Sequence, residues 1–265
     1  MKKLYLIFGI IIIVAAALPS RVLAQVLETE ESKPLLPRQF EIGTGLEFQT
    51  SKEGNETAFP LAIEYGLSKT FTLLIEPVGF TSIVAKNGPH AKGIGDLEIT
   101  LFYQIVSEKK ILPSISISGE IKIPTARNSL IGTGKTDYTP FLIMSKTTGR
   151  FFSSMNLSYT FLGKPAEVVA SNLFNYAIGT IFTVSSRSIL FAEFYGNSAS
   201  VDVPESAIIN SNNKTPEISG GENVGAIGYG YHIKKDLLIS LGINYDNNNA
   251  ILLRPGLEWK FGGKH

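Results

Sequence analysis

Hydrophobic and polar residues alternate with a period of two along most of this chain after residue 38. In the first run, Phe40, Ile42, Thr44, Leu46 and Phe48 share one face, and the residues between them are glycine, glutamate and glutamine. Successive side chains of a β-strand point to opposite sides, so this alternation indicates strands with one apolar face. The pattern predicts twelve strands, at 39–49, 58–66, 70–80, 95–106, 111–124, 137–146, 151–162, 173–184, 189–197, 222–233, 237–246 and 250–261.

Three of these runs do not show which face is apolar. The run at 70–80 has apolar residues on both faces, the run at 137–146 fits either frame, and the run at 189–197 carries aromatic residues on both sides. No stretch shows the 3.6-residue periodicity of an amphipathic helix.

The connections between the runs alternate between two kinds. Short polar turns are expected at 67–69, 107–110, 147–150, 185–188 and 234–236. Longer segments rich in Gly, Asn and Ser are expected at 50–57, 81–94, 125–136, 163–172 and 198–221, with 247–249 as the one short member. Outer-membrane barrels have short periplasmic turns, longer extracellular loops and an even number of strands. We therefore expect an all-β, up-and-down antiparallel transmembrane β-barrel of about twelve strands over 39–261, followed by a tail at 262–265.

In such a barrel the apolar stripe faces lipid and the polar stripe faces the lumen. The lumen-facing candidates are Glu41, Glu47, Glu64, Glu76, Asp96, Glu98, Glu120, Lys122, Arg254, Glu258 and Lys260. The aromatic residues expected at the membrane boundary are Tyr65, Phe71, Tyr103, Phe151, Tyr231, Trp259 and Phe261. The alternative is a soluble lipocalin-like barrel filled by aromatic residues, but such barrels usually have about eight strands.

Two interpretations of the lumen charges stay open. Lys122 and Arg254 can bridge carboxylates in a structural network, because unpaired buried charges are costly. The charges can equally form a filter, since rings of carboxylates favour cations. The acidic excess leads to the hypothesis of a mild cation preference.

The N-terminus has the features of a secretory signal peptide. Lys2 and Lys3 precede an apolar run from Leu4 to Leu18, and Ala24 ends a cleavage-site pattern. The run is short for a membrane anchor, so we expect cleavage after Ala24, export, and location in the outer membrane of a Gram-negative bacterium. Residues 25–38 would then form a periplasmic segment able to fold back as a plug.

Composition narrows the functions further. The 265 residues are 44% hydrophobic and 18% charged, carry a formal net charge of +1 and include no cysteine. This charge gives no basic face for nucleic acid, and the absence of cysteine excludes disulfides, cysteine zinc sites and thiol catalysis. His90, His232 and His265 have no metal-ligand spacing or nucleophile–base signature. We expect no cofactor, no metal and no enzymatic activity.

The glycine-rich segment at 132–136 resembles part of a nucleotide-binding loop. A P-loop needs a glycine where Ser129 stands, and a helix after the lysine. A strand pattern follows from Asp137 instead, so we expect no nucleotide.

Three motifs in the middle of the chain are similar to a known family. Gly93-Ile94-Gly95-Asp96 is followed by Lys122-Ile123-Pro124-Thr125 and then by Gly132-Thr133-Gly134-Lys135-Thr136-Asp137-Tyr138. This order resembles the outer-membrane transporters named for the meta-pathway of phenol degradation. The motifs cover about 90–165, and Ala126 stands where the family usually has glycine. The resemblance implies an outer-membrane barrel and the uptake of small, often hydrophobic or aromatic, molecules.

The expected function is therefore a channel for passive uptake of small molecules. Its expected partners are outer-membrane lipid, the small-molecule solute, and the barrel-assembly machinery, whose C-terminal signal the stripe ending at Trp259 and Phe261 resembles. The alternatives are a non-transporting barrel whose loops at 81–94 and 198–221 act as an adhesin or binding surface, a barrel hydrolase, and a soluble periplasmic β-protein.

Overall fold

The computed structural model describes residues 27–164, 171–198 and 221–263, and all of its regular elements are strands. The predicted signal peptide and most of the expected loop at 198–221 lie outside these residues. The strand segments are β1 (Gln39–Gly45), β2 (Glu47–Thr50), β3 (Gly54–Gly66), β4 (Phe71–Ala85), β5 (Ala91–Gly93), β6 (Leu97–Val106), β7 (Ser114–Ile123), β8 (Asp137–Thr148), β9 (Phe151–Thr160), β10 (Leu173–Thr183), β11 (Ser188–Asn197), β12 (Asn223–Lys234), β13 (Leu237–Asp246) and β14 (Ile251–Gly262).

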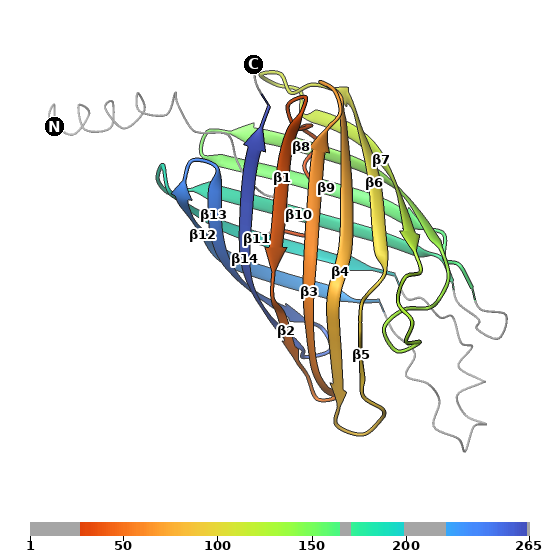
Figure 1. The fold of residues 1–265 in the computed structure, drawn as a ribbon. Coiled ribbons are helices and arrows are strands. Elements are labelled where there is room, and N and C mark those ends of the chain that lie inside the picture. The colour runs from red at the N-terminus through yellow and green to blue at the C-terminus, as the bar shows by residue number, and fades with distance from the viewer. Residues whose placement is uncertain (1–26, 165–170, 199–220, 264–265) are drawn as a thin grey trace, which may run out of the picture.

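These segments form one closed antiparallel barrel of twelve strands (Figure 1). β1 and β2 together make the first strand, since both pair with β3 on one side and β14 on the other. β5 and β6 likewise make one strand along β4. Closure occurs where Gln39 pairs with Gly262 and Gly45 pairs with Gly256. The predicted fold class and strand number are confirmed.

Two strands are longer than predicted at the end of the barrel that carries the longer loops. β3 begins at Gly54 and β4 continues to Ala85, so only residues 51–53 and 86–90 connect these hairpins. The predicted lengths of the loops at 50–57 and 81–94 were therefore wrong, because strands occupy part of both ranges. Asn55 pairs with Val84 and Thr57 with Ser82. Backbone pairing thus continues beyond the alternating segment, because ladder hydrogen bonds join backbone groups and need no apolar face.

The three ambiguous runs each have one defined inward face. In β4, Leu74 is buried and Phe71 is exposed. In β8, Ile143 is buried and Leu142 is exposed. In β11, Ile189, Phe191 and Glu193 are buried, and Leu190 and Phe194 are exposed. The mixed pattern arises because the lumen of this barrel also contains large apolar side chains.

The outer surface of the barrel is strongly apolar. Ile227 is 66% exposed and Leu101 is 45% exposed, each in the middle of a strand. Large exposed apolar patches are rare on soluble proteins, and a band of them around a closed barrel is typical of a membrane-spanning barrel. The residues that the structure describes include no helix long and apolar enough to cross a membrane.

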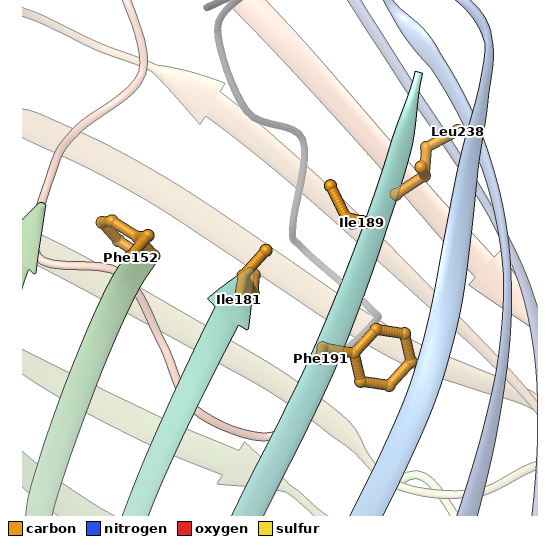
Figure 2. Close-up of a cluster of buried hydrophobic side chains, with 5 residues drawn as sticks. All are labelled: Phe152, Ile181, Ile189, Phe191 and Leu238. Atoms are coloured by element: carbon orange, nitrogen blue, oxygen red, sulfur yellow. The ribbon is translucent and has the colours of Figure 1, made fainter. Parts of the chain in front are cut away.

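Two clusters of buried apolar side chains line the inside. The first contains Phe152, Ile181, Ile189, Phe191 and Leu238, with Leu27 packed against it. Figure 2 shows these five side chains on β9, β10, β11 and β13, with the ring of Phe191 lying toward β12, the strand between β11 and β13. The second contains Ala62, Leu74, Phe102 and Ile143. The expectation of a lumen lined only by charged, small and polar residues was incomplete.

A glycine makes room for the largest of these side chains. A Cβ atom on Gly228 of β12 would lie 2.1 Å from Cζ of Phe191 and 2.5 Å from the backbone oxygen of Leu241. Only glycine lets the backbone approach the ring this closely. The glycine at position 228 of β12 therefore follows from the packing of Phe191.

Candidate functional site

The predicted lumen residues all lie on the inward side of the barrel, and none of the eleven is exposed. Glu41 and Glu258 are the most deeply buried, at 3% and 2% exposed. The others are half-buried. All eleven of these ionisable side chains therefore share the interior of the barrel.

Three basic side chains hold carboxylates in this lumen. Lys260 Nζ lies 2.5 Å from Oε2 of Glu41. Arg254 pairs with Glu47 at 2.5 Å and also with Glu28 of the N-terminal segment. Each pair joins different strands or joins a strand to that segment. The pairs offset part of the cost of placing charges inside a barrel.

Lys122 forms the third such contact, with Asp137 at 2.5 Å and with Asp96 at 3.9 Å. Asp137 is a site residue that sequence reasoning missed. It opens the run at 137–146, which fits either frame, so its inward direction could not be read. The spacing of Asp137, Thr139 and Ser145 in one frame was the available signal.

Several lumen carboxylates have no basic partner. Glu76 of β4 is paired in register with Glu98 of β6, and Glu98 is opposite Lys122 of β7. Within the described ranges, Glu76, Glu98 and Glu56 take part in no ion pair at 4.0 Å or less. Three carboxyl groups without a basic partner within 4.0 Å therefore gather on this wall.

These carboxylates line a cavity of about 640 Å³. Its charged lining residues are Glu28, Glu47, Glu56, Glu76, Asp96, Glu98, Lys122 and Arg254. Its apolar lining residues include Leu27, Leu61, Val78, Ile83, Leu130 and Ile131. The volume is in the range of small-molecule pockets, and the lining combines an acidic wall with apolar surface.

The loop at 124–136 forms one side of this cavity through its lining residues, which are Leu130, Ile131, Gly132 and Thr133. Two other residues of the loop are tied to the segment before β6. The backbone N–H of Ala126 donates to Oδ1 of Asp96 at 2.9 Å. The hydroxyl of Thr125 donates to the backbone oxygen of Gly95 at 2.8 Å. The three motifs that carry the family resemblance thus meet at one place and hold this loop over the lumen.

The N-terminal segment lies inside the barrel as well. Backbone N–H groups of Glu28 and Thr29 donate to the Glu193 carboxylate at 3.0 and 2.6 Å. The Leu35 N–H donates to the Thr72 hydroxyl at 3.0 Å. Sequence reasoning missed Glu193, although a carboxylate within the apolar run from Leu190 to Tyr195 is an unusual feature.

The predicted boundary aromatics gather at the end with the short turns. Phe71 stacks on Tyr103 with ring centroids 4.7 Å apart, and Trp259 lies 4.5 Å from Phe261. The other three members are Tyr65, which contacts Phe40, Phe151, which contacts Phe182, and the exposed Tyr231. Sequence reasoning missed a second group near the loop end, which includes Tyr159, Phe161, Phe174, Tyr176 and Phe194.

His232 faces the lumen and is 8% exposed. Its Nδ1 atom is buried without a hydrogen-bond partner among the described residues. A hydrolase would need a serine hydroxyl bonded to this ring. Among all the residues that the structure describes, no group of three or more His, Asp and Glu residues is arranged to hold a metal ion.

No family model and no curated protein matches this chain in sequence. Solved structures do match it in fold. The COG4313 outer membrane channel from Pseudomonas putida F1 is 10% identical, with 89% of this chain and 100% of that chain covered and a TM-score of 0.69. The NanC porin is 12% identical, with 83% and 100% covered and a TM-score of 0.58.

The KdgM porin in complex with disordered oligogalacturonate is 11% identical, with 84% of this chain and 99% of that chain covered and a TM-score of 0.55. At such low identity these likenesses speak to the fold alone. The chain has the closed β-barrel fold of outer-membrane channels and porins.

Proposed function

We propose that this protein is an outer-membrane channel for the passive uptake of small hydrophobic or aromatic molecules, and that it belongs to the transporters named for the meta-pathway of phenol degradation. The observation that carries the proposal is the cavity of about 640 Å³ inside a closed barrel. The mechanism involves no chemical step. Solute diffuses through a lumen whose size, charge and apolar surface select it.

The apolar surface of the lumen supports hydrophobic solutes. Leu27 lies at the cavity and also packs against the cluster that contains Phe191 and Leu238. A small aromatic molecule leaving the cavity can therefore stay in contact with apolar side chains. Such contacts lower the cost of removing the molecule from water.

The acidic surface supports a preference for cations over anions. Glu56, Glu76 and Glu98 line the cavity without a basic partner in the described ranges. Carboxylates around a pore attract cations and repel anions at close range. An aromatic amine fits both properties of the lining, and an aromatic carboxylate fits only one.

The N-terminal segment supports a plugged resting state. Its bonds to Glu193 and Thr72 come from opposite regions of the wall, on β11 and β4. A segment tied at both ends across the lumen narrows the path between the two ends of the barrel. Solute passage then requires this segment to move.

Single-channel recording in planar bilayers tests the proposal. We expect small steps of conductance that benzylamine reduces at lower concentration than benzoate, because only benzylamine carries a positive charge. A protein that inserts but never conducts would overturn the channel proposal. Equal effects of the two solutes would overturn the role of the acidic wall.

The outer-membrane location and insertion by the barrel-assembly machinery form part of the same proposal. β14 ends at Gly262, and Trp259 faces outward beside the first strand. Heat-modifiable gel mobility and partition into detergent test the location. A protein that stays in the aqueous phase would be a soluble periplasmic β-protein instead.

A further inference from the structure

We propose that the lumen wall carries a track that binds an extended peptide backbone, and that residues 28–35 occupy this track as an intramolecular ligand. The ligand class is an extended oligopeptide. The inference goes beyond the proposed uptake of small molecules and rests on it only in that the lumen must be reachable from one end of the barrel.

The first contact of the track is the carboxylate of Glu193 on β11. It accepts the backbone N–H groups of Glu28 and Thr29 and also the hydroxyl of Thr29. In the described part of the chain Glu193 forms no ion pair. Its buried carboxyl oxygens are therefore satisfied by N–H and O–H donors of the segment.

The second contact is the side-chain amide of Asn156 on β9. Its Oδ1 accepts the N–H of Glu30 at 2.6 Å, and its Nδ2 donates to the backbone oxygen of the same residue at 3.1 Å. One amide thus takes both polar groups of one peptide residue. Main-chain bonds of this kind give affinity without reading the side chain of the ligand.

The third contact surrounds Ser32. Its N–H donates to the hydroxyl of Ser145 at 2.9 Å. Its backbone oxygen accepts from the hydroxyls of Ser116 at 2.5 Å and Ser114 at 3.4 Å, and from Nε2 of Gln104 at 3.3 Å.

The last contact is that of the Leu35 N–H with the Thr72 hydroxyl on β4. From residue 28 to residue 35, the contacts therefore move in order across β11, β9, β8, β7, β6 and β4, which follow one another in the sheet apart from β10 between β11 and β9. The wall groups therefore form one row across the strands, interrupted only at β10.

β10 contributes space to the track. A Cβ atom on Gly179 would lie 2.9 Å from Oγ1 of Thr29 and 3.1 Å from a methyl group of Leu27. Because this position has no side chain, the segment can pass close to the wall between Glu193 and Asn156. Gly179 therefore leaves room for the peptide backbone between the hydrogen-bonding side chains of β11 and β9.

Most of the recognition is independent of sequence. The bonds described above take seven backbone groups of the segment, which any residue other than proline can supply. Three of its side chains also interact: Glu28 with Arg254, Thr29 with Glu193, and Glu31. A different extended peptide can therefore form most of the same bonds once residues 28–35 leave.

The test uses the full-length chain with Glu30→Pro and Ser32→Pro together. This variant removes the two N–H groups that donate to Asn156 and Ser145, and so weakens the intramolecular ligand. The probe is a dye-labelled synthetic peptide with the sequence of residues 27–36, and its binding to purified protein in detergent is followed by fluorescence anisotropy.

We expect the probe to bind the double variant about tenfold more tightly than it binds the unmodified protein. This factor corresponds to the loss of one to two hydrogen bonds of the competing intramolecular segment. A peptide of scrambled sequence should bind within a few-fold of the first. A peptide with methylated backbone nitrogens should bind far more weakly, because its N–H donors are gone.

Asn156→Leu in the double variant should weaken binding of both unmodified peptides. Asn175→Leu is the matched control, because Asn175 lies on the neighbouring strand β10 and donates to Ser158 and Thr160. Unchanged probe affinity in the double variant, or equal binding of the methylated peptide, would overturn the track. Conductance of the unmodified protein is recorded separately, so a failed track leaves the channel proposal standing.

Discussion

The ammonium group of Lys122 lies 2.5 Å from Oδ2 of Asp137 and 3.9 Å from Oδ2 of Asp96. Lys122 is near the end of β7 and Asp137 begins β8, so the pair joins the two ends of the loop at 124–136. Asp96 holds the same loop through the N–H of Ala126. One basic side chain therefore fixes the loop that forms a side of the cavity.

Lys122→Met should release this loop. Removing one partner leaves two largely buried carboxylates side by side, a change that costs about 3 kcal/mol for a buried pair. We expect trypsin to cleave after Arg127, inside the loop, faster than in the unmodified protein. Mass spectrometry of timed digests measures the rate. Lys92→Met is the control, since Lys92 is exposed on β5 near the same loop. Equal cleavage in both variants would contradict the role of Lys122.

Removing the uncompensated carboxylates should abolish the cation preference. The triple change Glu56→Gln, Glu76→Gln and Glu98→Gln keeps the shape of the cavity lining and replaces three carboxyl groups by amides that cannot ionise. We expect the reversal potential in a salt gradient to move toward that of a non-selective pore. Glu108→Gln, in the turn between β6 and β7, should leave the potential unchanged. Anion selectivity in the unmodified protein would sink the hypothesis.

The alternation of residues predicts the barrel well because lipid imposes it. Outward positions in the membrane are mostly apolar, so strands such as β1 and β9 can be recognised from their sequence. The alternation is absent where a strand face does not contact lipid. β3 and β4 continue past it as a paired ladder, and Phe191 brings a large ring to the inward face of β11.

The candidate site was only partly predictable for the same reason. Alternation places Glu41, Arg254 and Lys260 on the inward face, but the partner of each depends on contacts between different strands. The pairing of Arg254 with Glu28 involves the N-terminal segment, which has no periodic pattern. Contacts of this kind depend on how the segment enters the barrel, and no local spacing encodes that path.

Gly228→Ala should destabilise the barrel. The added Cβ atom would lie 2.1 Å from the ring of Phe191 and 2.5 Å from the backbone oxygen of Leu241, so both the ring and the backbone would have to shift. Overpacking of this kind typically costs about 1–3 kcal/mol. The midpoint of unfolding in urea, read from heat-modifiable gel mobility, measures the effect. Gly225→Ala is the control on the same strand, because no atom lies within 4 Å of its added Cβ. Equal midpoints for the two variants would contradict the close packing of Phe191 on β12.

Glu108 should contribute stability that depends on pH. Partial burial raises the pKa of its carboxyl, but the hydrogen bonds from the Thr147 N–H and from Lys146 outweigh burial and bring the pKa below its ordinary value. A lowered pKa adds stability above the unfolded-state pKa, and this stability is lost as the pH falls through the folded-state pKa.

Glu108→Gln should therefore lower the free energy of unfolding at neutral pH by under about 1 kcal/mol, as expected for an exposed pair, and have no effect in acid. The urea midpoint at each pH measures this change. Asp236→Asn, in the turn between β12 and β13, is the control, since its side chain has no hydrogen bond or ion pair in the portion of the chain that is described. A difference that grows as the pH falls would contradict the assignment.

Trp259 reports where the barrel sits in a membrane, because it is the only tryptophan of the chain. Its side chain is 47% exposed on the outward face and belongs to the aromatic group at the end with the short turns. Aromatic residues at this level lie at the boundary of the bilayer. In liposomes, lipids brominated near the headgroup should quench its fluorescence more than lipids brominated near the chain end. A matched variant moves the probe to the middle of a strand by combining Trp259→Phe with Ile227→Trp, and its quenching should show the opposite order. Absence of quenching at both positions would mean that the apolar outer face does not contact lipid.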